Sequence, residues 1–453
     1  MKKIYLILLA LVFLTFSIAP CAFSEVVNGP SRVLSLKDAI NVAFLSNKDI
    51  QIQEEEIASA RANITDAQGK FLPTLDATAS YTYYGTMFTI PSAVAPNLKK
   101  DIGIFNGYQN DNKLGLSVNE TVFNGGANIV NMKQARLGLK IQEQTLRARK
   151  FDVEFDTKRL YYGLLFAYET ERITKNLLEQ AQAHYEDVKN KFDQGTSSRF
   201  DVLQSKVQVS KVMPELIKAQ NDIDLIKADL KKLLSLKMTE DIGLKDDKLM
   251  CSYIEIKEDE FLKEAYATNP QVILKMMGVD MNKWGIEYAK AGYGPFINAS
   301  FDYMYRSNSV NTIFEYKHTN WNAGASVTIP IFDAFSTKAK VDEAKAKYAQ
   351  ANLEKEDIND QVAVDIKKAC LDMKEAKEIL DYEKDSIEEA KEALRIANIG
   401  YDNGVKTNLD VLDSQVSLSQ VERSYVEGIY DYLMARAFLD KTTGRAFYKE
   451  ENK

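Results

Sequence analysis

The sequence predicts an α+β protein made of two tandem copies of one unit, in which a pair of amphipathic strands is followed by a very long helical hairpin. Three observations predict this class. The chain aligns with itself at a nearly constant offset, two proline-free segments carry apolar residues at coiled-coil spacing, and four short segments alternate apolar and polar residues. Each long helix would extend for about 100 Å, which is too long for a globular core.

The first 24 residues are predicted to be a secretory signal peptide. Two lysines precede an apolar run over residues 4–18, and a small-residue segment follows. We expect cleavage after Ser24. Lipidation of Cys21 is the alternative that stays open, although Pro20 suits a lipobox poorly. The mature chain is therefore expected to leave the cytoplasm.

The composition of the chain excludes several classes of protein. A net charge of -7 offers no basic field for nucleic acid. After signal cleavage only Cys251 and Cys370 remain, too few for a disulfide framework, and the sequence leaves open whether they pair. Beyond the signal no window approaches 18 uninterrupted apolar residues, so no transmembrane helix is predicted, although membrane-crossing strands leave a weaker pattern.

The internal duplication is the strongest feature of the sequence. At an offset of 209 positions Phe123 aligns with Phe332, and at an offset of 222 Pro73 aligns with Pro295. The first copy therefore has 13 more residues between its proline and its phenylalanine, as expected of a surface loop. We divide the mature chain into a first repeat at 25–247 and a second repeat at 248–453.

The helices of each repeat are predicted from their apolar spacing. The first long helix keeps a strict seven-residue repeat, the mark of a left-handed coiled coil, at Met132, Leu139, Leu146, Val153, Leu160 and Ala167. Repeat one should contain helices at 48–70 and 128–194, a tip turn at 195–201 and a return helix to 236. Repeat two should contain helices at 270–291 and 334–403, a tip turn at 404–410 and a return helix to 443. Counting residues predicts that the two shorter helices of each repeat stack end to end along the long one.

The strands are predicted at 73–84, 113–124, 295–305 and 321–332. Each alternates apolar and polar residues over about 10 to 12 positions, enough to cross a bilayer when tilted, with aromatic residues toward one end. Glu120 interrupts the apolar phase of the second strand. Four strands cannot close a barrel, so several chains would have to combine, and the pattern alone does not set their number.

The two tips repeat one phrase, GTSSRFDVLQ at 195–204 and GVKTNLDVLD at 404–413. Glycine suits a left-handed helix end, and a hydroxyl residue followed three positions later by aspartate suits a capping box at the next helix. These residues are Gly195, Ser198 and Asp201 in the first tip, and Gly404, Thr407 and Asp410 in the second. Asp413 is not needed for capping, and its counterpart in the first tip is Gln204. Asp413 lies on the same helix face as Asp410, three residues earlier.

No catalytic residue, metal site or cofactor is expected. The only histidines, His184 and His318, lie far apart without cysteine or carboxylate neighbours at metal-ligand spacing, and no P-loop or nucleophile elbow occurs. We expect His184 to be a solvated side chain of a charged helix and His318 to lie in an external loop.

Along essentially its whole mature length the chain resembles the TolC-like outer-membrane efflux proteins. The resemblance is carried by the tandem copies, the strand endings SVNETVFNGG and SVTIPIFDAF, the tip motif G-x-x-[ST]-x-x-D-V-L and the segment LKKLLSL. It implies a homotrimer with a 12-stranded outer-membrane β-barrel, a long α-barrel in the periplasm of a Gram-negative-type cell, and an equatorial belt formed by residues 237–260 and the C-terminal tail.

The resemblance also implies a function and partners. The chain would be the passive channel subunit of a tripartite efflux or type I secretion system, surrounded by outer-membrane lipid. It would be opened at its tip by a periplasmic adaptor (membrane fusion) protein and an inner-membrane pump of the RND, ABC or MFS class. The exported cargo cannot be deduced. A periplasmic coiled-coil structural or adaptor protein is the alternative, but it would lack the paired strand hairpins.

The resemblance assigns roles to tip residues. Asp410 and Asp413 match aspartates that form acidic rings at the closed periplasmic entrance. Tyr401 and Lys406 match latch residues that bond to the neighbouring tip, and Asp201 matches one acceptor of those bonds. Lys406 stands where the family usually has arginine, so a bidentate lock is lost and a looser gate is expected.

Overall fold

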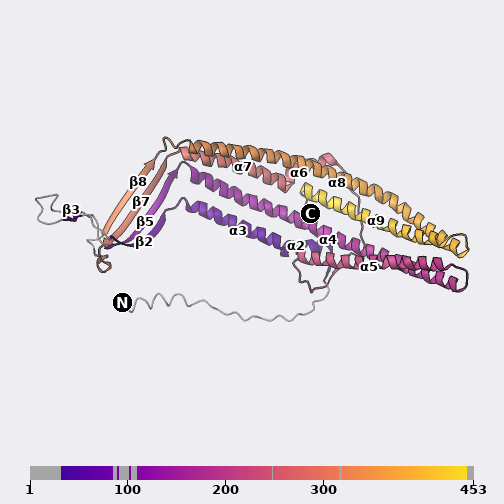
Figure 1. Cartoon of the computed structure of the whole chain (residues 1–453). Helices are drawn as coiled ribbons and strands as arrows, with labels where there is room; N and C mark the ends of the chain where they lie inside the picture. The colour runs from indigo at the N-terminus through magenta and orange to yellow at the C-terminus, as the bar shows by residue number, and fades with distance from the viewer. Residues whose placement is uncertain are drawn as a thin grey trace.

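The structure of the chain is a computed structural model that describes residues 32–84, 89–90, 102–103, 110–246, 248–315 and 319–445. The predicted signal peptide, Cys21, His318 and the end of the C-terminal tail lie outside the described residues, as does most of the segment between the first two strands. Figure 1 shows one elongated molecule, with the strands at one end and, at the other end, the two turns that join each long helix to its return helix.

Four antiparallel strands form one sheet in the order β2-β5-β7-β8. They are β2 (Thr74–Tyr83), β5 (Asn110–Asn124), β7 (Phe296–Ser307) and β8 (Thr319–Thr328). Because side chains alternate along each strand, the apolar residues of all four strands share one face, as the pairs Leu75 with Val118 and Phe301 with Ala323 show. The two short strands β3 (Thr89–Ile90) and β4 (Ile102–Gly103) pair separately.

β8 ends at Thr328, four residues before the predicted end of this strand. The reason lies in its neighbour, because β7 begins at Phe296, directly opposite Thr328. The following residues, up to Phe332, therefore have no strand beside them within the chain. In the first repeat the equivalent residues belong to the end of β5. They remain in a strand up to Asn124 because β7 pairs with β5 there.

Two helices of 67 residues run the length of the molecule: α4 (Ala127–Asp193) and α8 (Ser336–Asp402). At 1.5 Å per residue each is about 100 Å long. Shorter helices lie along them in pairs, as the residue count predicts (Figure 1): α3 (Lys48–Gly69) and α5 (Arg199–Leu233) along α4, and α7 (Pro270–Lys290) and α9 (Asn408–Thr443) along α8.

An asparagine at an equivalent position holds each end-to-end junction. Asn47 caps the N-terminus of α3 with its side-chain oxygen, and its Nδ2 donates to the carbonyl of Leu233 at the end of α5, at 2.9 Å. Asn269 caps α7 in the same way and donates to the carbonyl of Thr442 in α9 at 2.8 Å. One side chain thus serves the free N–H groups of one helix and a free carbonyl of the other.

Several elements have no counterpart in the predicted set. α2 (Leu36–Ser46), α6 (Glu258–Thr268) and a parallel pair formed by β1 (Arg32–Leu34) and β6 (Ile242–Leu244) surround the middle of the bundle. The 3-10 turns η1 (Ala291–Tyr293) and η2 (Val310–Thr312) lie elsewhere, between α7 and β7 and between β7 and β8. The hydroxyl of Tyr161 on α4 ties the β1–β6 pair down by donating to Asp246 at 2.6 Å and to the Leu34 carbonyl at 3.2 Å. The connector between the repeats therefore packs on the middle of α4, where the belt was expected.

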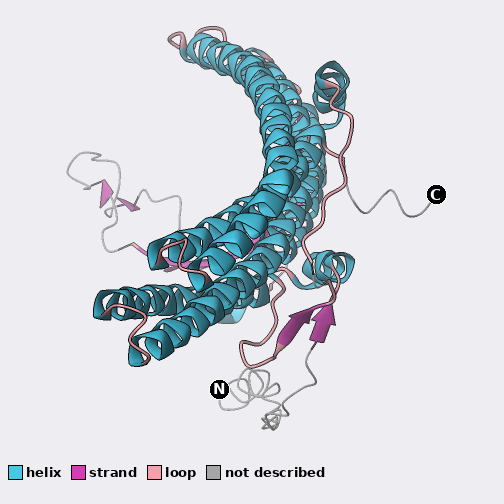
Figure 2. Ribbon diagram, turned by 90° about the vertical axis from the view of Figure 1, so that its right-hand side faces the viewer, coloured by secondary structure: helices cyan, strands magenta, loops and turns pink. Residues whose placement is uncertain are grey.

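The helices follow one another along a curved layer (Figure 2) instead of enclosing a central core. The buried residues accordingly concentrate near the middle of the molecule, where α4, α8 and α9 meet the belt elements. Of the heptad positions in α4, Val153 and Ala167 are buried and the others are half-buried. Cys251 and Cys370 are both free thiols.

Among the described residues, no helix combines the length and the apolar character that a membrane crossing requires.

Candidate functional site at the helical tips

Each long helix ends in the same kind of turn. Gly195 and Gly404 have φ values of 79° and 72°, in the left-handed region that glycine enters without strain. In the first tip the N–H of Thr196 donates to the Lys191 carbonyl at 2.9 Å, and in the second the N–H of Val405 donates to the Gly400 carbonyl at 2.8 Å. These are the bonds of a Schellman motif, which satisfies the last carbonyls of a helix and reverses the chain.

Each return helix then begins with a reciprocal capping box. Ser198 caps α5 by accepting from the N–H of Asp201, while the Asp201 carboxylate accepts from the backbone and the hydroxyl of Ser198. Thr407 and Asp410 make the same exchange at α9. The hydrogen bonds from Thr407, helped by nearby Lys406, lower the pKa of Asp410, so this carboxylate stays charged over the physiological range.

The two acidic residues of the second tip lie one turn apart on α9. Asp410 is half-buried beside its cap, whereas Asp413 is exposed. Nothing described within the chain neutralises the pair fully, since the Lys406 ammonium stands 3.9 Å from the Asp410 carboxylate. The position therefore presents negative charge at the extreme end of the molecule.

Lys406 reaches back over the turn because Gly400 has no side chain. A Cβ at Gly400 would lie 2.5 Å from Cγ of Lys406. In the first tip Lys191 corresponds to Gly400 and Ser197 corresponds to Lys406. The long basic side chain therefore precedes the turn in the first tip and follows the turn in the second. This exchange of residues between the copies is a second sequence signal, beside Asp413 and Gln204, that the tips are not equivalent.

Tyr401 packs against the first hairpin. Its ring lies edge-on to the ring of His184, with centroids 5.2 Å apart, and the Lys191 ammonium stands 4.2 Å from its centroid. Lys191 also pairs with Asp402 at 2.8 Å and with Asp187 at 2.9 Å. Burial alone would lower the pKa of Lys191, but its bonds to these two carboxylates outweigh burial and raise it. Tyr401 and Asp402 thus join α8 to α4.

A buried polar node, which we define as His184, Asn408, Ser205 and Gln204, lies behind the tips. The Asn408 oxygen accepts from the Ser205 hydroxyl at 3.0 Å and lies 2.7 Å from Nε2 of His184, and its Nδ2 donates to Gln204 at 2.9 Å. His184, Asn408 and Ser205 are 8%, 3% and 0% exposed. One side chain at the start of α9 therefore bonds to both helices of the first hairpin.

The expectation that His184 is solvated is wrong. Its helix is rich in charge, but α9 of the other hairpin covers this face, which one hairpin's sequence does not reveal. Burial lowers the pKa of His184, against a smaller opposing effect of its bond to Asn408, so the ring is neutral at pH 7. Because its partner is an amide oxygen, Nε2 is the donor.

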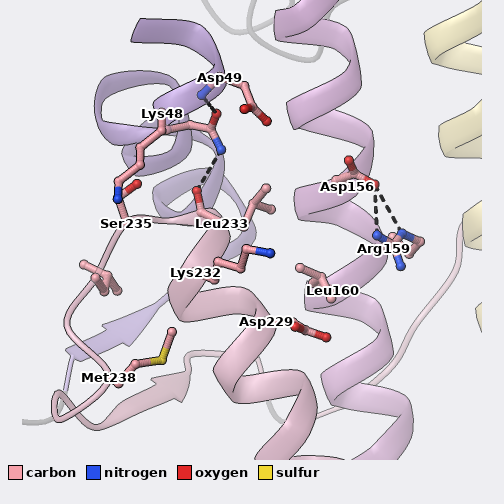
Figure 3. A pocket seen from close by; sticks show the side chains of 12 residues that line it. Lys48, Asp49, Asp156, Arg159, Leu160, Asp229, Lys232, Leu233, Ser235 and Met238 are labelled. Atoms are coloured by element: carbon pink, nitrogen blue, oxygen red, sulfur yellow. Dashed lines mark hydrogen bonds and ion pairs between the residues drawn. The ribbon is translucent and has the colours of Figure 1, made fainter. Parts of the chain in front are cut away.

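A pocket of about 570 Å³ lies far from the tips, where α3 and α5 abut on α4 (Figure 3). Its charged lining is balanced between three basic and three acidic residues: Lys48, Arg159 and Lys232 against Asp49, Asp156 and Asp229. Figure 3 shows the Asp156–Arg159 pair and the junction bonds around Asp49 and Leu233. Within the described part of the chain, no group of three or more metal-ligating side chains is assembled.

Comparison with known proteins agrees with this architecture. The model of the family "Outer membrane efflux protein" matches residues 39–235 and 262–445. The chain is 21% identical to outer membrane protein TolC of Escherichia coli K12 over 432 residues, covering 91% of this chain and 83% of TolC. It is 21% identical to outer membrane efflux protein BepC of Brucella suis, covering 78% of each chain.

Solved structures show the same fold. The Campylobacter jejuni CmeC outer membrane channel superposes with a TM-score of 0.77 at 18% identity, covering 94% of this chain and 90% of that one. The resemblance that the tip and strand motifs suggested is confirmed. The chain belongs to the outer membrane efflux protein family.

Proposed function

We propose that this outer-membrane efflux channel works as a passive homotrimeric conduit whose periplasmic tip is opened by an adaptor protein and an inner-membrane pump. The observation that carries the proposal is the placement of the sheet and the tips at opposite ends of helices about 100 Å long. A chain of this shape can hold one end in the outer membrane while its tips reach toward proteins of the inner membrane.

Unpaired sheet edges support association of several chains. β2 and β8 are the outer strands of the sheet, and each has a strand neighbour on one side only. Their apolar side chains are also exposed, with Leu75 at 68%, Trp321 at 65% and Val327 at 62%. Three chains would contribute 12 strands and would pair every edge while turning the apolar face to lipid.

We propose that Asp410 and Asp413 form the acidic rings of the gate. Three copies would place six carboxylates around one narrow aperture at the tips. Crowded negative charge with little local neutralisation attracts cations and disfavours anions. Splaying of the tips by an adaptor would widen the aperture and weaken this preference.

The latch assignment is retained as part of the proposal, with Tyr401 and Lys406 bonding to a neighbouring tip and Asp201 as one acceptor. Within the chain one Asp201 oxygen is engaged by Ser198, which leaves the other oxygen for a neighbour. The Lys406 side chain is 47% exposed and holds Asp410 only loosely. A single ammonium makes a weaker lock than a guanidinium fork, so the gate should open readily.

The repeat boundaries at 25–247 and 248–453 are proposed on the same basis, because each range contributes one hairpin to the four-stranded sheet and then one helical hairpin, in the same order. No specificity for cargo is proposed for this chain. Relatives carry names such as toluene efflux pump outer membrane protein TtgC of Pseudomonas putida, 22% identical over 428 residues. We propose that the inner-membrane pump selects the cargo and that the channel conducts it.

Membrane fractionation tests the proposal. The channel should be recovered in the outer-membrane fraction and should migrate as an oligomer on an unboiled denaturing gel, then as a monomer after boiling. A periplasmic coiled-coil or adaptor protein would be recovered in the soluble periplasmic fraction. Such recovery, in a strain whose efflux is unaffected by deletion of the gene, would refute the proposal.

A further inference from the structure

We infer that the helix ends next to the sheet form a collar that binds anionic phospholipids of the periplasm-facing leaflet of the outer membrane. The collar has two parts, an aromatic part where strands meet helices (Phe71, Phe123, Tyr293 and Phe335) and a basic part in the first three turns of the long helices (Lys133, Arg136, Lys338 and Lys340). The inference rests on the proposed placement of the sheet in the membrane. It adds a partner of stated chemistry to that placement.

Both long helices begin at the sheet end of the molecule (Figure 1). α4 starts at Ala127, three residues after β5 ends at Asn124. α8 starts at Ser336, eight residues after β8 ends at Thr328. Side chains on an α-helix lean toward its N-terminus. The basic side chains near the start of α4 and α8 therefore lean toward the membrane.

The charges near these two helix starts run against the helix dipole. A helix N-terminus favours acidic side chains, and α2, α3, α5, α6 and α9 each have one or more in the first turn. α4 and α8 have none there, and neither has α7, which begins with Pro270. Instead, residues 127–142 contain three basic residues and no acidic one, and α8 has Lys338 and Lys340 in its first five positions. Anions outside the chain would offset the cost of this arrangement.

The nearest carboxylates do not neutralise the basic part of the collar. Asp333 accepts from the backbone N–H of Thr337 at 2.7 Å. The next acidic residues of α8, Asp342 and Glu343, pair with lysines that follow them, at 3.4 and 2.7 Å. Within the described part of the chain, the other basic members of the collar make no ion pair, and the Lys133 ammonium stands 4.2 Å from the ring centroid of Trp284. That contact orients the charge without cancelling it.

An exposed aromatic side chain lies at each of the four junctions between a strand and a helix. The exposed fractions are 45% for Phe71, 38% for Phe123, 55% for Tyr293 and 67% for Phe335. The ring of Phe335 also lies edge-on to that of Phe332, with centroids 5.6 Å apart. Aromatic rings gather where the hydrocarbon of a bilayer meets the headgroups. The aromatic part of the collar therefore marks the membrane surface, and the basic part begins just beyond it.

The basic part lies within reach of lipid phosphates. The headgroup region extends about 5 to 8 Å on each side of the hydrocarbon. At 1.5 Å per residue, Lys338 and Lys340 lie about 3 and 6 Å from the start of α8, and Lys133 lies about 9 Å from the start of α4. Each basic residue close to an anionic surface strengthens binding about fivefold. Several of them in each chain give the collar a marked preference for anionic lipid.

Lipid retention by the purified full-length channel tests the collar. The channel is equilibrated in detergent with equal amounts of phosphatidylglycerol, which is anionic, and phosphatidylcholine, which is zwitterionic, and the bound lipid is quantified by mass spectrometry. The test variant replaces the basic part of the collar with glutamine: Lys133→Gln, Arg136→Gln, Lys338→Gln and Lys340→Gln. The matched control removes four exposed charges from the same two helices, far from the sheet: Lys175→Gln, Lys189→Gln, Lys368→Gln and Lys384→Gln.

We expect the wild type and the control to retain phosphatidylglycerol about fivefold or more over phosphatidylcholine at 0.1 M salt, and the test variant about twofold or less. At 1 M salt the Debye length falls to about 3 Å, so the preference of the wild type should disappear. A test variant with the preference of the wild type, or a preference that persists at 1 M salt, would overturn the collar. Lys338→Gln with Lys340→Gln should give an intermediate preference, which decides the question if the fourfold variant does not assemble.

Failure of the collar and failure of the channel proposal give different results. Migration on an unboiled gel and single-channel conductance are measured for every protein in the series. A wild type that assembles and conducts without preferring phosphatidylglycerol overturns the collar alone. A wild type that neither assembles nor conducts refutes the channel proposal and the collar with it.

Discussion

Nε2 of His184 on α4 lies 2.7 Å from the side-chain oxygen of Asn408, the first residue of α9. This bond joins the two hairpins of the chain just behind the tips, at residues 224 positions apart in the sequence. Movement of one hairpin away from the other must break this bond. If the bond stays intact, the two hairpins move together as one body.

Loss of the bond should loosen the tips. Replacing His184 with Phe keeps an aromatic edge against Tyr401 but removes one of the two donors to the buried Asn408 oxygen. Because the Ser205 hydroxyl still donates to that oxygen, the cost should be about 0.5 to 1.5 kcal/mol. Amide hydrogen exchange in the tip residues should accelerate about two- to tenfold. His184→Gln, which keeps a donor, should restore slow exchange, and equal exchange in both variants would show that the bond contributes nothing.

The same histidine should make the tips sensitive to acid. Its folded-state pKa lies below the reference value of 6.5, so the unfolded tip binds the proton more tightly. The stability it provides is complete above pH 6.5 and is lost as the pH falls from there toward the lowered pKa. The protection of the tip amides, which is their exchange rate relative to the intrinsic rate at the same pH, should fall across this window in the wild type and fall less in His184→Gln. The charged groups around the ring, Asp187, Lys191 and Asp402, remain unchanged in the comparison.

The acidic pair of the second tip should set ion selectivity. Asp410→Asn with Asp413→Asn removes six charges from a trimer while the amide at 410 can still accept from Thr407. Cation preference in planar-bilayer recording should fall several-fold. Asp193→Asn, an exposed tip residue at the end of α4, is the matched control and should leave selectivity unchanged. Unaltered selectivity in the double variant would place the filter elsewhere.

The hydroxyl and the ring of Tyr401 can be tested separately. Within the chain the ring contacts His184 and Lys191, and these contacts do not need the hydroxyl. In the proposed latch the hydroxyl bonds to a neighbouring tip. Tyr401→Phe removes that bond without disturbing the ring contacts, and should therefore raise the single-channel conductance. Tyr382→Phe, on the same helix and 78% exposed, should have no effect. Equal conductance of all three channels would remove Tyr401 from the latch.

The turns between strand and long helix should respond in opposite ways to exchange of glycine and alanine. Ala334→Gly relieves a left-handed backbone and should stabilise the protein by about 1 kcal/mol. Gly125→Ala places a Cβ 2.0 Å from a carbonyl oxygen and should destabilise it by at least about 2 kcal/mol. Thermal unfolding followed by helical circular dichroism gives the order, and a lower melting temperature for Ala334→Gly would contradict the first expectation.

Local patterns predicted most of the architecture because they act within one segment. The heptads around Val153 predict a long helix from spacing alone, and the alternation around Leu75 predicts a strand with one apolar face. The short helix α2 was missed, although Ser35 and Asp38 form a capping box there, because it is brief and joined directly to α3. The end of β8 was misplaced because a strand ends where its neighbour ends, at Phe296, and that neighbour is set by topology.

The duplication, the long helices and main strands of each repeat, the turns at Gly195 and Gly404 and the family could all be predicted from the chain, because they follow from residues close together or at a constant offset. The burial of His184, the bonds of Asn408 to both helices of the other hairpin and the place of Tyr401 beside His184 and Lys191 became known only from the fold. These facts depend on which helix covers which face, and such packing between distant segments has no local pattern in the chain.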